Sequence, residues 1–213
     1  TVDVGAFELT QFDFGDGPIL TSIANDGARH VATGPTLGAV RDVENDGIES
    51  AVANSDDLNG ADDEDGITFG AIQVGQQNAT VTINVQGGSA KLDAWIDFNG
   101  DGSFNGPHEQ IFDSVSVTTG NNNLTFDVPA EGTVAGSSIA RFRLSTLGDL
   151  TPTGIASDGE VEDYVVTLTE IDGDGIFADS GQSLGTAYTR GIAAGDVDGD
   201  GDVDVFAANS NGD

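Results

Sequence analysis

Cysteine and methionine are absent from this 213-residue sequence, and both cationic residues and prolines are scarce. Without cysteine, the chain can form neither disulfides nor thiolate metal sites. It has 6 Lys+Arg against 37 Asp+Glu, and the resulting net charge of −31 disfavours nucleic acid and anionic membranes as partners. No apolar run approaches the roughly 18 residues of a membrane-spanning helix. A folded chain must therefore be stabilised by an apolar core and by cations held by oxygen ligands.

Charge of one sign at this density destabilises a compact state unless something positive is bound. High net charge combined with low hydrophobicity is also the signature of disorder. Here 37% of the residues are hydrophobic, including 11 Phe, and they occur in alternating runs that suffice for a core. We therefore expect a folded chain whose acids are metal ligands and solvated surface. The 31 glycines and 5 prolines predict many tight turns and exclude collagen.

Composition divides the chain into four stretches. Residues 1–10 are a strand-like lead, residues 11–70 an acidic region of calcium-binding loops, residues 71–170 an alternating β region, and residues 171–213 a return to dense Asp-Gly. The sequence starts at Thr1 without a signal peptide, so we expect a mature or excised piece of a longer secreted polypeptide.

The alternating region predicts β-strands. In 79–86, Ala79, Val81, Ile83 and Val85 share one face, and polar residues occupy the other. The same rule holds for 90–97, 111–117, 124–128, 139–145 and 161–168, with turn clusters at 86–89, 119–123 and 148–158. We therefore predict an all-β fold, an antiparallel β-sandwich of jelly-roll type with long calcium-binding loops and little helix.

Alternating carboxylates in 196–204 form the sharpest candidate metal site, in which Gly201 permits a tight turn. Its candidate ligands are Asp196, Asp198, Asp200, Asp202 and Asp204. Calcium takes 6–8 oxygen ligands and suits such a loop better than magnesium does. A solvated acidic turn is the alternative, but the carboxylates would then repel one another without a cation.

A second candidate follows the strand that ends in Trp95-Ile96. Its candidate ligands are Asp97, Asn99, Asp101, Ser103 through its carbonyl, and Glu109. Gly102 occupies the position of the obligatory turn in an EF-hand loop, although Glu109 stands one residue later than that loop's bidentate Glu, with His108 in its place. The alternative is an ordinary Asx-rich turn.

Weaker candidates lie in the acidic region and just after the β region. They are Asp42, Glu44, Asp46, Asp62, Asp63 and Asp65, together with Asp172 and Asp174. A loop so long and so poor in core residues seldom orders itself, so we expect either ordering by ions or a solvated loop. Each extracellular calcium site at 100 times its dissociation constant adds about 2.7 kcal/mol, and we expect the calcium-free protein to be partly unfolded.

Three motifs resemble the GEVED domain of large bacterial secreted proteins: WIDFNGDGSF, RFRLST at Arg141–Thr146 and DGEVEDY at Asp158–Tyr164. The acidic lead resembles the segment that usually precedes that domain, so the resemblance covers about residues 11–170. It implies a β module of surface proteins. Ser103 stands where the family often has a further acid.

The tail resembles one FG-GAP/VCBS repeat, a calcium-bearing blade of β-propellers. The resemblance implies that the five aspartates of 196–204 are ligands, Asp202 through its carbonyl. Because such repeats need neighbours to bury their faces, we expect truncation or pairing with another chain. Residues 2–9 resemble the closing strand of a β-helix.

Nothing in the sequence marks a catalytic centre. His30 and His108, the two imidazoles, lie in Gly/Asp-rich stretches, and we expect both to be solvated loop residues. We expect Trp95 to pack in the sheet rather than serve as a sugar platform. Arg141 and Arg143 share a strand face, and we expect them to neutralise acids of a neighbouring strand, namely Glu160, Glu162 or Asp163.

These observations favour a calcium-stabilised extracellular structural or adhesion module of a large bacterial surface protein, and not an enzyme. One alternative is a fibre subunit that assembles by adding strand Val2–Leu9 to another copy. Another is a calcium-dependent carbohydrate-binding domain. The expected partners are calcium, other copies through open β edges, and a glycan or protein adhesion target. We expect secretion to the cell surface without direct membrane insertion.

Overall fold

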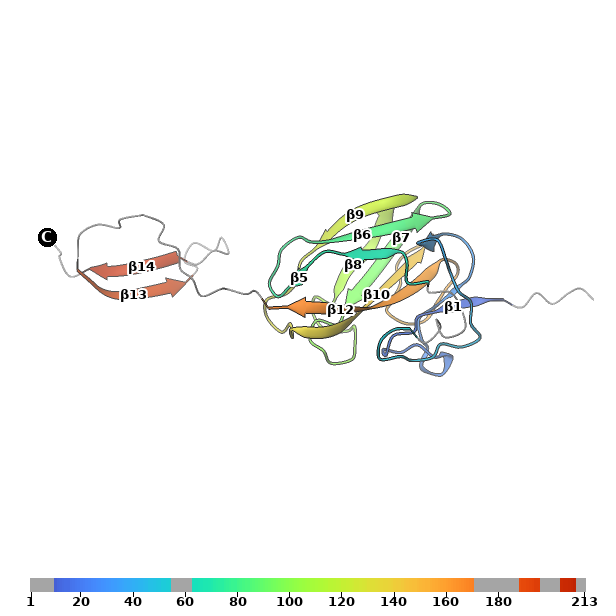
Figure 1. Ribbon diagram of the computed structural model, residues 1–213, viewed down its shortest axis with the longest axis horizontal. Coiled ribbons are helices and arrows are strands. Elements are labelled where there is room, and N and C mark those ends of the chain that lie inside the picture. The colour runs from blue at the N-terminus through green and yellow to red at the C-terminus, as the bar shows by residue number, and fades with distance from the viewer. Residues whose placement is uncertain (1–9, 55–62, 171–187, 196–203, 210–213) are drawn as a thin grey trace, which may run out of the picture. The chain divides into compact units, whose positions relative to one another are not determined.

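The computed structural model describes residues 10–54, 63–170, 188–195 and 204–209 (Figure 1). Packing divides the chain into two units, Thr1–Asp172 and Gly173–Asp213. Within the described ranges, no helix has both the length and the apolar character needed to cross a membrane.

Nearly all regular structure is β, as predicted. In the first unit the strands are β1 (Phe12–Phe14), β2 (Arg29–Val31), β3 (Thr36–Leu37), β4 (Ile67–Phe69), β5 (Ile72–Gln73), β6 (Ala79–Gln86), β7 (Ala90–Ile96), β8 (Gln110–Val117), β9 (Gly120–Phe126), β10 (Gly136–Ser145), β11 (Ile155–Ala156) and β12 (Glu160–Thr169). One short 3-10 helix, η1, spans Ile23–Asn25. The second unit contains β13 (Thr189–Gly195) and β14 (Asp204–Asn209), an antiparallel pair.

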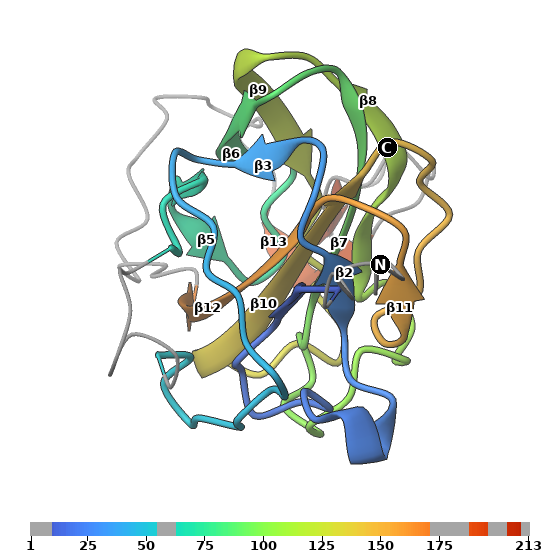
Figure 2. The same ribbon diagram turned by 90° about the vertical axis from the view of Figure 1, so that its right-hand side faces the viewer.

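Two sheets pack face to face to form the sandwich (Figures 1 and 2). One has the order β5-β12-β10-β7-β8, and the other has the order β3-β6-β4 with β9 added to β6. The face of β6 that carries Val81 and Ile83 is buried, as its alternation predicted. It meets Leu92, Phe142 and Leu168 of the facing sheet in one core, while Phe69 packs edge-on against Phe142. The pairing is mostly antiparallel, which confirms the predicted sandwich.

The predicted turn at 119–123 is wrong, because β9 already begins at Gly120 and pairs with β6. Its asparagines are tolerated on an exposed face because they form a side-chain ladder. The Asn84 Nδ2 donates to Asn121 Oδ1 at 2.6 Å, and the Thr82 hydroxyl donates to Asn123 Oδ1 at 2.9 Å. Cross-strand hydrogen bonds therefore replace the apolar pairs that usually mark a strand.

The acidic region contributes more regular structure than its sequence suggests. It contains β1 to β4, and β1, β2 and β11 form a separate three-stranded sheet. These strands are only two or three residues long, too short to show a period of two. Ile19 from this region packs with Trp95, Phe104 and Ile139, on the face of β7 and β10 opposite the main core. The predicted burial of Trp95 is thus confirmed.

Candidate metal centres

The loop after β7 is organised by the carboxylate of Asp97. Its Oδ1 accepts hydrogen bonds from the backbone N–H of Gly100 at 2.7 Å and of Asp101 at 3.2 Å, and its Oδ2 accepts one from Gly102 at 2.9 Å. Gly100 and Gly102 have φ values of +70° and +77°, in the left-handed region that glycine adopts without strain. The turn predicted at Gly102 is therefore present.

Asp97, Asp101 and Glu109 each offer an oxygen atom, and these atoms lie within 4.8 Å of one another. We call this group the loop site. Glu109 is 1% exposed; its Oε2 accepts a hydrogen bond from Gly106 N–H at 2.6 Å, whereas its Oε1 is buried without a hydrogen-bond partner. Burial raises the pKa of Glu109, and the negative charges of Asp97 and Asp101 raise it further. A bound cation would offset both the cost of burying this carboxylate and its repulsion by Asp97 and Asp101.

The remaining residues predicted for this loop lie around the loop site. Asn99 Oδ1 accepts from Asp101 N–H at 2.7 Å, and Asn99 Nδ2 donates to Asp101 Oδ2 at 3.2 Å. The Ser103 hydroxyl accepts from Asn105 N–H at 3.1 Å, and the role predicted for the Ser103 carbonyl stays a prediction. His108 is exposed with φ +66°, as expected for a solvated loop histidine.

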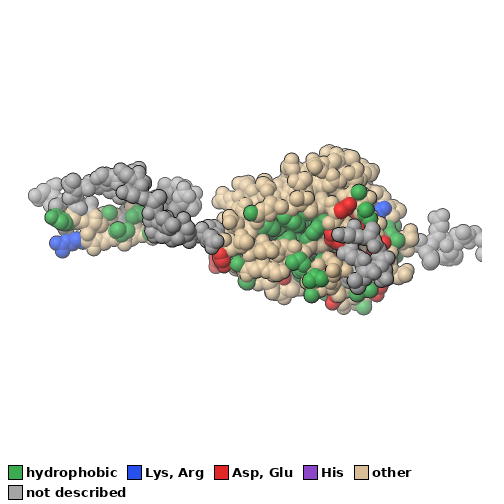
Figure 3. All heavy atoms as spheres, in the orientation of Figure 1, with side chains coloured by type: hydrophobic (Ala, Val, Ile, Leu, Met, Phe, Trp, Pro, Cys, Tyr) green, Lys and Arg blue, Asp and Glu red, His purple; other side chains and the backbone are tan. Residues whose placement is uncertain are grey.

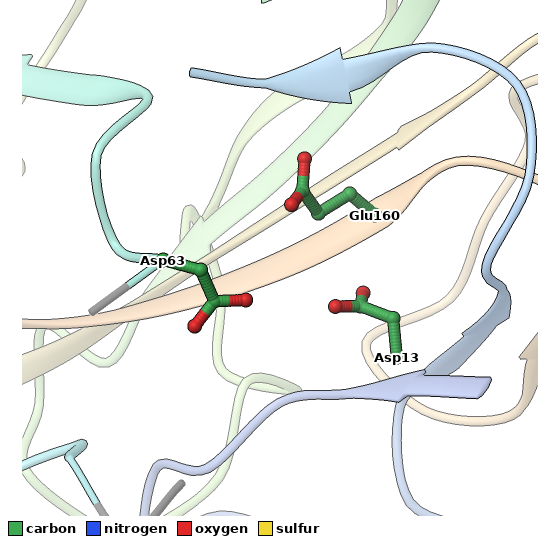
Figure 4. A group of neighbouring side chains, drawn as sticks. All are labelled: Asp13, Asp63 and Glu160. Atoms are coloured by element: carbon green, nitrogen blue, oxygen red, sulfur yellow. The ribbon is translucent and has the colours of Figure 1, made fainter. Parts of the chain in front are cut away.

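A second group of carboxylates lies inside the sandwich unit. Asp13 of β1, Asp63 and Glu160 of β12 point toward one another in Figure 4, with one oxygen of each within 4.8 Å of the others. We call this group the interior site. The three residues are 1%, 3% and 0% exposed. Burial and the charge of Glu160 raise the pKa of Asp13, and burial and the charge of Glu162 raise the pKa of Glu160 to about 10.

Each interior-site carboxylate is held by a backbone N–H from another segment. Asp13 Oδ2 accepts from Val161 N–H at 2.7 Å, and Asp63 Oδ2 accepts from Asp42 N–H at 2.9 Å. Glu160 Oε2 accepts from Leu37 N–H, while Glu160 Oε1 is buried without a hydrogen-bond partner. The site is therefore built from four parts of the chain, and its geometry does not depend on one loop.

The other predicted acids of the acidic region that the structure describes accept hydrogen bonds from separate backbone N–H groups. Asp42 Oδ1 accepts from the adjacent Val43 N–H at 2.7 Å, Glu44 Oε2 from Phe14 N–H at 3.0 Å, Asp46 Oδ1 from Ile23 N–H at 2.6 Å, and Asp65 Oδ1 from Ala39 N–H at 3.0 Å. Within the described residues, the structure does not gather them into a common ion site. Glu44 is close enough to Asp13 to raise its pKa further.

Several predicted ligands lie outside the described residues. They are Asp62, Asp172, Asp174, Asp196, Asp198, Asp200 and Asp202. Asp204 begins β14, where its backbone pairs with Gly195. The calcium site at 196–204 therefore stays a prediction.

The two arginines of β10 differ in their partners. Arg141 Nε and Nη2 donate to the two oxygens of Asp163 at 2.7 Å each, which confirms one expected pair. For Arg143 the expectation is wrong: its guanidinium donates to the carbonyls of Thr151, Thr153, Arg29 and Gly154 and to His30. Burial and the charge of Arg141 lower the pKa of Arg143 to about 9, so Arg143 stays charged at neutral pH.

His30 is also placed differently from the expectation, because it is fully buried in β2. Its Nε2 accepts from Arg143 Nε at 3.1 Å, which leaves Nδ1 to donate to the Asp158 carbonyl at 2.7 Å. These contacts select one neutral tautomer. Burial and the charge of Arg143 lower the pKa of His30 well below its usual value.

The sequence does not indicate that Asp13 and Glu160 come together, because they lie in separate segments. One signal was present in β12 itself. Alternation places Glu160 and Glu162 on the same face as Val166 and Leu168, where a core strand should carry apolar residues. Acids at core positions indicate a functional or ion-binding role.

Part of the chain matches a known protein family. Residues 91–167 match the GEVED domain. No curated protein and no solved structure matches this chain. The match extends from β7 to β12, so it includes the loop site and the Glu160 side of the interior site.

The GEVED string itself is Gly159 to Asp163, and most of its members make contacts that only the folded chain provides. Gly159 has φ +96°, and a Cβ there would lie 1.7 Å from the Leu144 carbonyl oxygen. Glu162 Oε1 accepts from Gly66 N–H at 3.0 Å, and Asp163 Oδ2 accepts from Gly17 N–H at 2.7 Å. Together with Glu160, these acids fasten the acidic region to β12.

Proposed function

We propose that this protein is a calcium-stabilised extracellular β module with a structural or adhesive role in a large bacterial surface protein. The loop site carries this proposal. Its three carboxylates converge in the loop for which the sequence predicts calcium, and the buried Glu109 Oε1 has no hydrogen-bond partner. Oxygen ligands in a flexible loop suit calcium, which also accepts carbonyl and water ligands.

An ion in the loop site would act on the fold rather than on a substrate. Asp97 directly follows β7, and Glu109 directly precedes β8, so an ion held by both joins two neighbouring strands of one sheet. Binding to the folded state alone stabilises it by mass action. A structural role is also supported by His30, whose two ring nitrogens are used inside the protein and do not face a substrate.

The extracellular setting is supported by composition and by the family match. The chain carries a net charge of −31, and its resemblance to the GEVED domain implies a module of bacterial secreted proteins. The fibre and carbohydrate alternatives have less support. The donor strand Val2–Leu9 lies outside the described residues, and Trp95 is 2% exposed, so it offers no stacking face to a sugar.

Thermal unfolding of the full chain in calcium and in excess EDTA tests the proposal. We expect Asp101→Asn to lose part of the stabilisation by calcium, up to about 2.7 kcal/mol at 100 times the dissociation constant. Asp113→Asn, which removes an exposed carboxylate from β8, is the matched control and should respond to calcium like the unmodified protein. Identical melting temperatures in calcium and EDTA would overturn the proposal.

Terbium luminescence gives a second readout at the same site. Trp95 packs against Phe104 of the loop, so it is well placed to sensitise a Tb³⁺ ion held there. Emission should appear with the unmodified protein and fall with Asp101→Asn. Gel filtration with and without EDTA tests fibre assembly, and a glycan array in calcium tests the carbohydrate alternative.

A further inference from the structure

The interior site has a feature that an ordinary solvated acidic cluster lacks. Glu160 is fully buried, and its Oε1 lies in the interior without a hydrogen-bond partner. Leaving a buried charged oxygen unsatisfied costs more than a typical hydrogen bond contributes. In Figure 4 the Glu160 carboxylate faces those of Asp13 and Asp63. Ionised carboxylates accept hydrogen bonds and do not donate them, so neither neighbour can satisfy Glu160 Oε1.

No cationic side chain of the described residues forms an ion pair with Asp13 or Glu160. The ion pairs of this part of the chain are Arg29–Asp26 and Arg141–Asp163. Arg41, which is close enough to influence Glu160, donates instead to the carbonyls of Thr33 and Gly159. Buried charges are normally paired or coordinate metals. The charge that neutralises the interior site must therefore come from bound protons or from a cation that is not a side chain of the described residues.

The arrangement of oxygens matches a hard divalent cation. All three groups are carboxylates, one oxygen of each lies within 4.8 Å of the others, and a backbone N–H holds the other oxygen of Glu160 and one oxygen of Asp13. Calcium and similar ions take carboxylate ligands in irregular sets completed by carbonyls or water. The alternative is a cluster in which Asp13 or Glu160 keeps a proton, and the ion count described below distinguishes it from a bound cation.

We propose that Asp13, Asp63 and Glu160 bind a divalent cation, calcium in the setting proposed above, and that this ion fastens β1 and the segment at 63–66 to β12. This goes beyond the proposed function, which rests on the loop site. The segments joined are distant in sequence, since Asp13 and its partner Val161 are 148 positions apart. Without the ion, these acids must either take up protons or repel one another, and in both cases the link between the segments is lost. With it, the ion closes the acidic region onto the sandwich.

Ion counting by native mass spectrometry of the full chain, stripped with EDTA and reloaded with calcium chloride, tests the proposal. Glu160→Gln retains an acceptor for Leu37 N–H but removes the charge, and it should bind one calcium fewer than the unmodified protein. Glu170→Gln makes the same change at an exposed position after β12 and should leave the count unchanged. An unchanged count in Glu160→Gln would overturn the inference.

Hydrogen exchange locates the effect and separates this inference from the proposed function. Calcium should slow exchange at β1 and residues 63–66 in the unmodified protein and in Asp101→Asn, but at least tenfold less in Glu160→Gln. If Glu160→Gln does not fold, Asp13→Asn provides the same comparison. Loss of calcium protection at β1 in Asp101→Asn as well would overturn an independent interior site. Failure of Asp101→Asn to lose its own ion would contradict only the loop site.

Discussion

At the scale of single residues, the GEVED string is defined by backbone geometry as much as by charge. Gly159 adopts φ +96°, which L side chains rarely adopt, and its α-carbon faces the Leu144 carbonyl at a distance that leaves no space for a methyl group. The next residue, Glu160, reaches Leu37 and the interior site only because the chain turns at Gly159. Replacement of this glycine should therefore disturb the fold and the site together.

Gly159→Ala is expected to lower the free energy of unfolding by at least about 3 kcal/mol, because an unfavourable φ is combined with a collision. Gly132→Ala is the matched control: Gly132 has φ +84°, but nothing lies within 4 Å of a Cβ built there. Strain alone should cost about 1 kcal/mol at that position. Urea unfolding of both variants in calcium measures the difference, and equal costs would show that the Leu144 carbonyl is not an obstacle.

Protonation of His30 should destabilise the protein in mild acid. Its pKa is lowered in the folded state, whereas the unfolded chain binds a proton below about pH 6.5. The unfolded state then carries more protons, so stability falls as pH decreases through 6.5, by about 1.4 kcal/mol at pH 5.5. Comparison of urea unfolding at pH 7.5 and 5.5 in saturating calcium measures this loss.

His30→Gln is the control for the histidine contribution. Its amide retains an acceptor for Arg143 and a donor for the Asp158 carbonyl, but it does not titrate. The variant should lose about 1.4 kcal/mol less than the unmodified protein between the two pH values. The same loss in both proteins would assign the acid sensitivity to other groups.

At the scale of elements, the face of β10 and β12 opposite the main core is closed by a buried polar layer. Arg141 and Asp163 are both fully buried, and they form a bidentate ion pair across the two strands. Arg141 also donates to the Pro152 carbonyl at 2.9 Å and lies 5.4 Å from the centre of the Phe104 ring. This layer joins strands β10 and β12 to the loops that cover them.

Breaking this pair should be costly, because it leaves a buried charge without compensation. We expect Asp163→Asn to lower the free energy of unfolding by about 3–5 kcal/mol. The exposed Asp113→Asn, which makes the same chemical change, should alter it by no more than about 0.5 kcal/mol. Urea unfolding in calcium measures both, and a cost below about 1 kcal/mol for Asp163→Asn would indicate that water replaces the lost partner.

At the scale of the whole molecule, the fold must tolerate a net charge of −31. Figure 3 shows that, on the face it presents, acidic side chains of the sandwich unit gather mainly at the end where β1 lies. Cations bound at this end would reduce the repulsion between its acidic side chains. The loop and interior sites should therefore determine how stability depends on calcium and on ionic strength.

We expect the calcium-free protein to gain more stability from salt than the calcium-loaded protein does. Raising sodium chloride from about 0.1 M to about 1 M shortens the screening length from about 10 Å to about 3 Å, which weakens repulsion between uncompensated carboxylates. Melting temperatures in EDTA and in calcium at both salt concentrations measure how strongly the effect of salt on stability depends on bound calcium. An equal increase in both states would indicate that the repulsion is not relieved by calcium.

The sequence by itself determined most of the long strands of the sandwich and the residues of the loop site, because these depend on local patterns. Alternation along 79–86 defines a buried face whatever its partner, and Asp97, Asn99 and Asp101 lie in one turn because few residues separate them. Even there, the sequence does not indicate that the asparagines of β9 form a strand, because their side-chain hydrogen bonds are made to another strand.

Only the tertiary structure decided the burial of His30, the partners of Arg143 and the convergence of Asp13, Asp63 and Glu160. These contacts join segments that are distant in the chain, and no spacing in the sequence encodes which of many acids will meet. The strands that bring them together are two or three residues long in the acidic region, too short to carry a period. Their positions are set by the longer strands that they contact, which are β12 for β1 and β2 and β6 for β3.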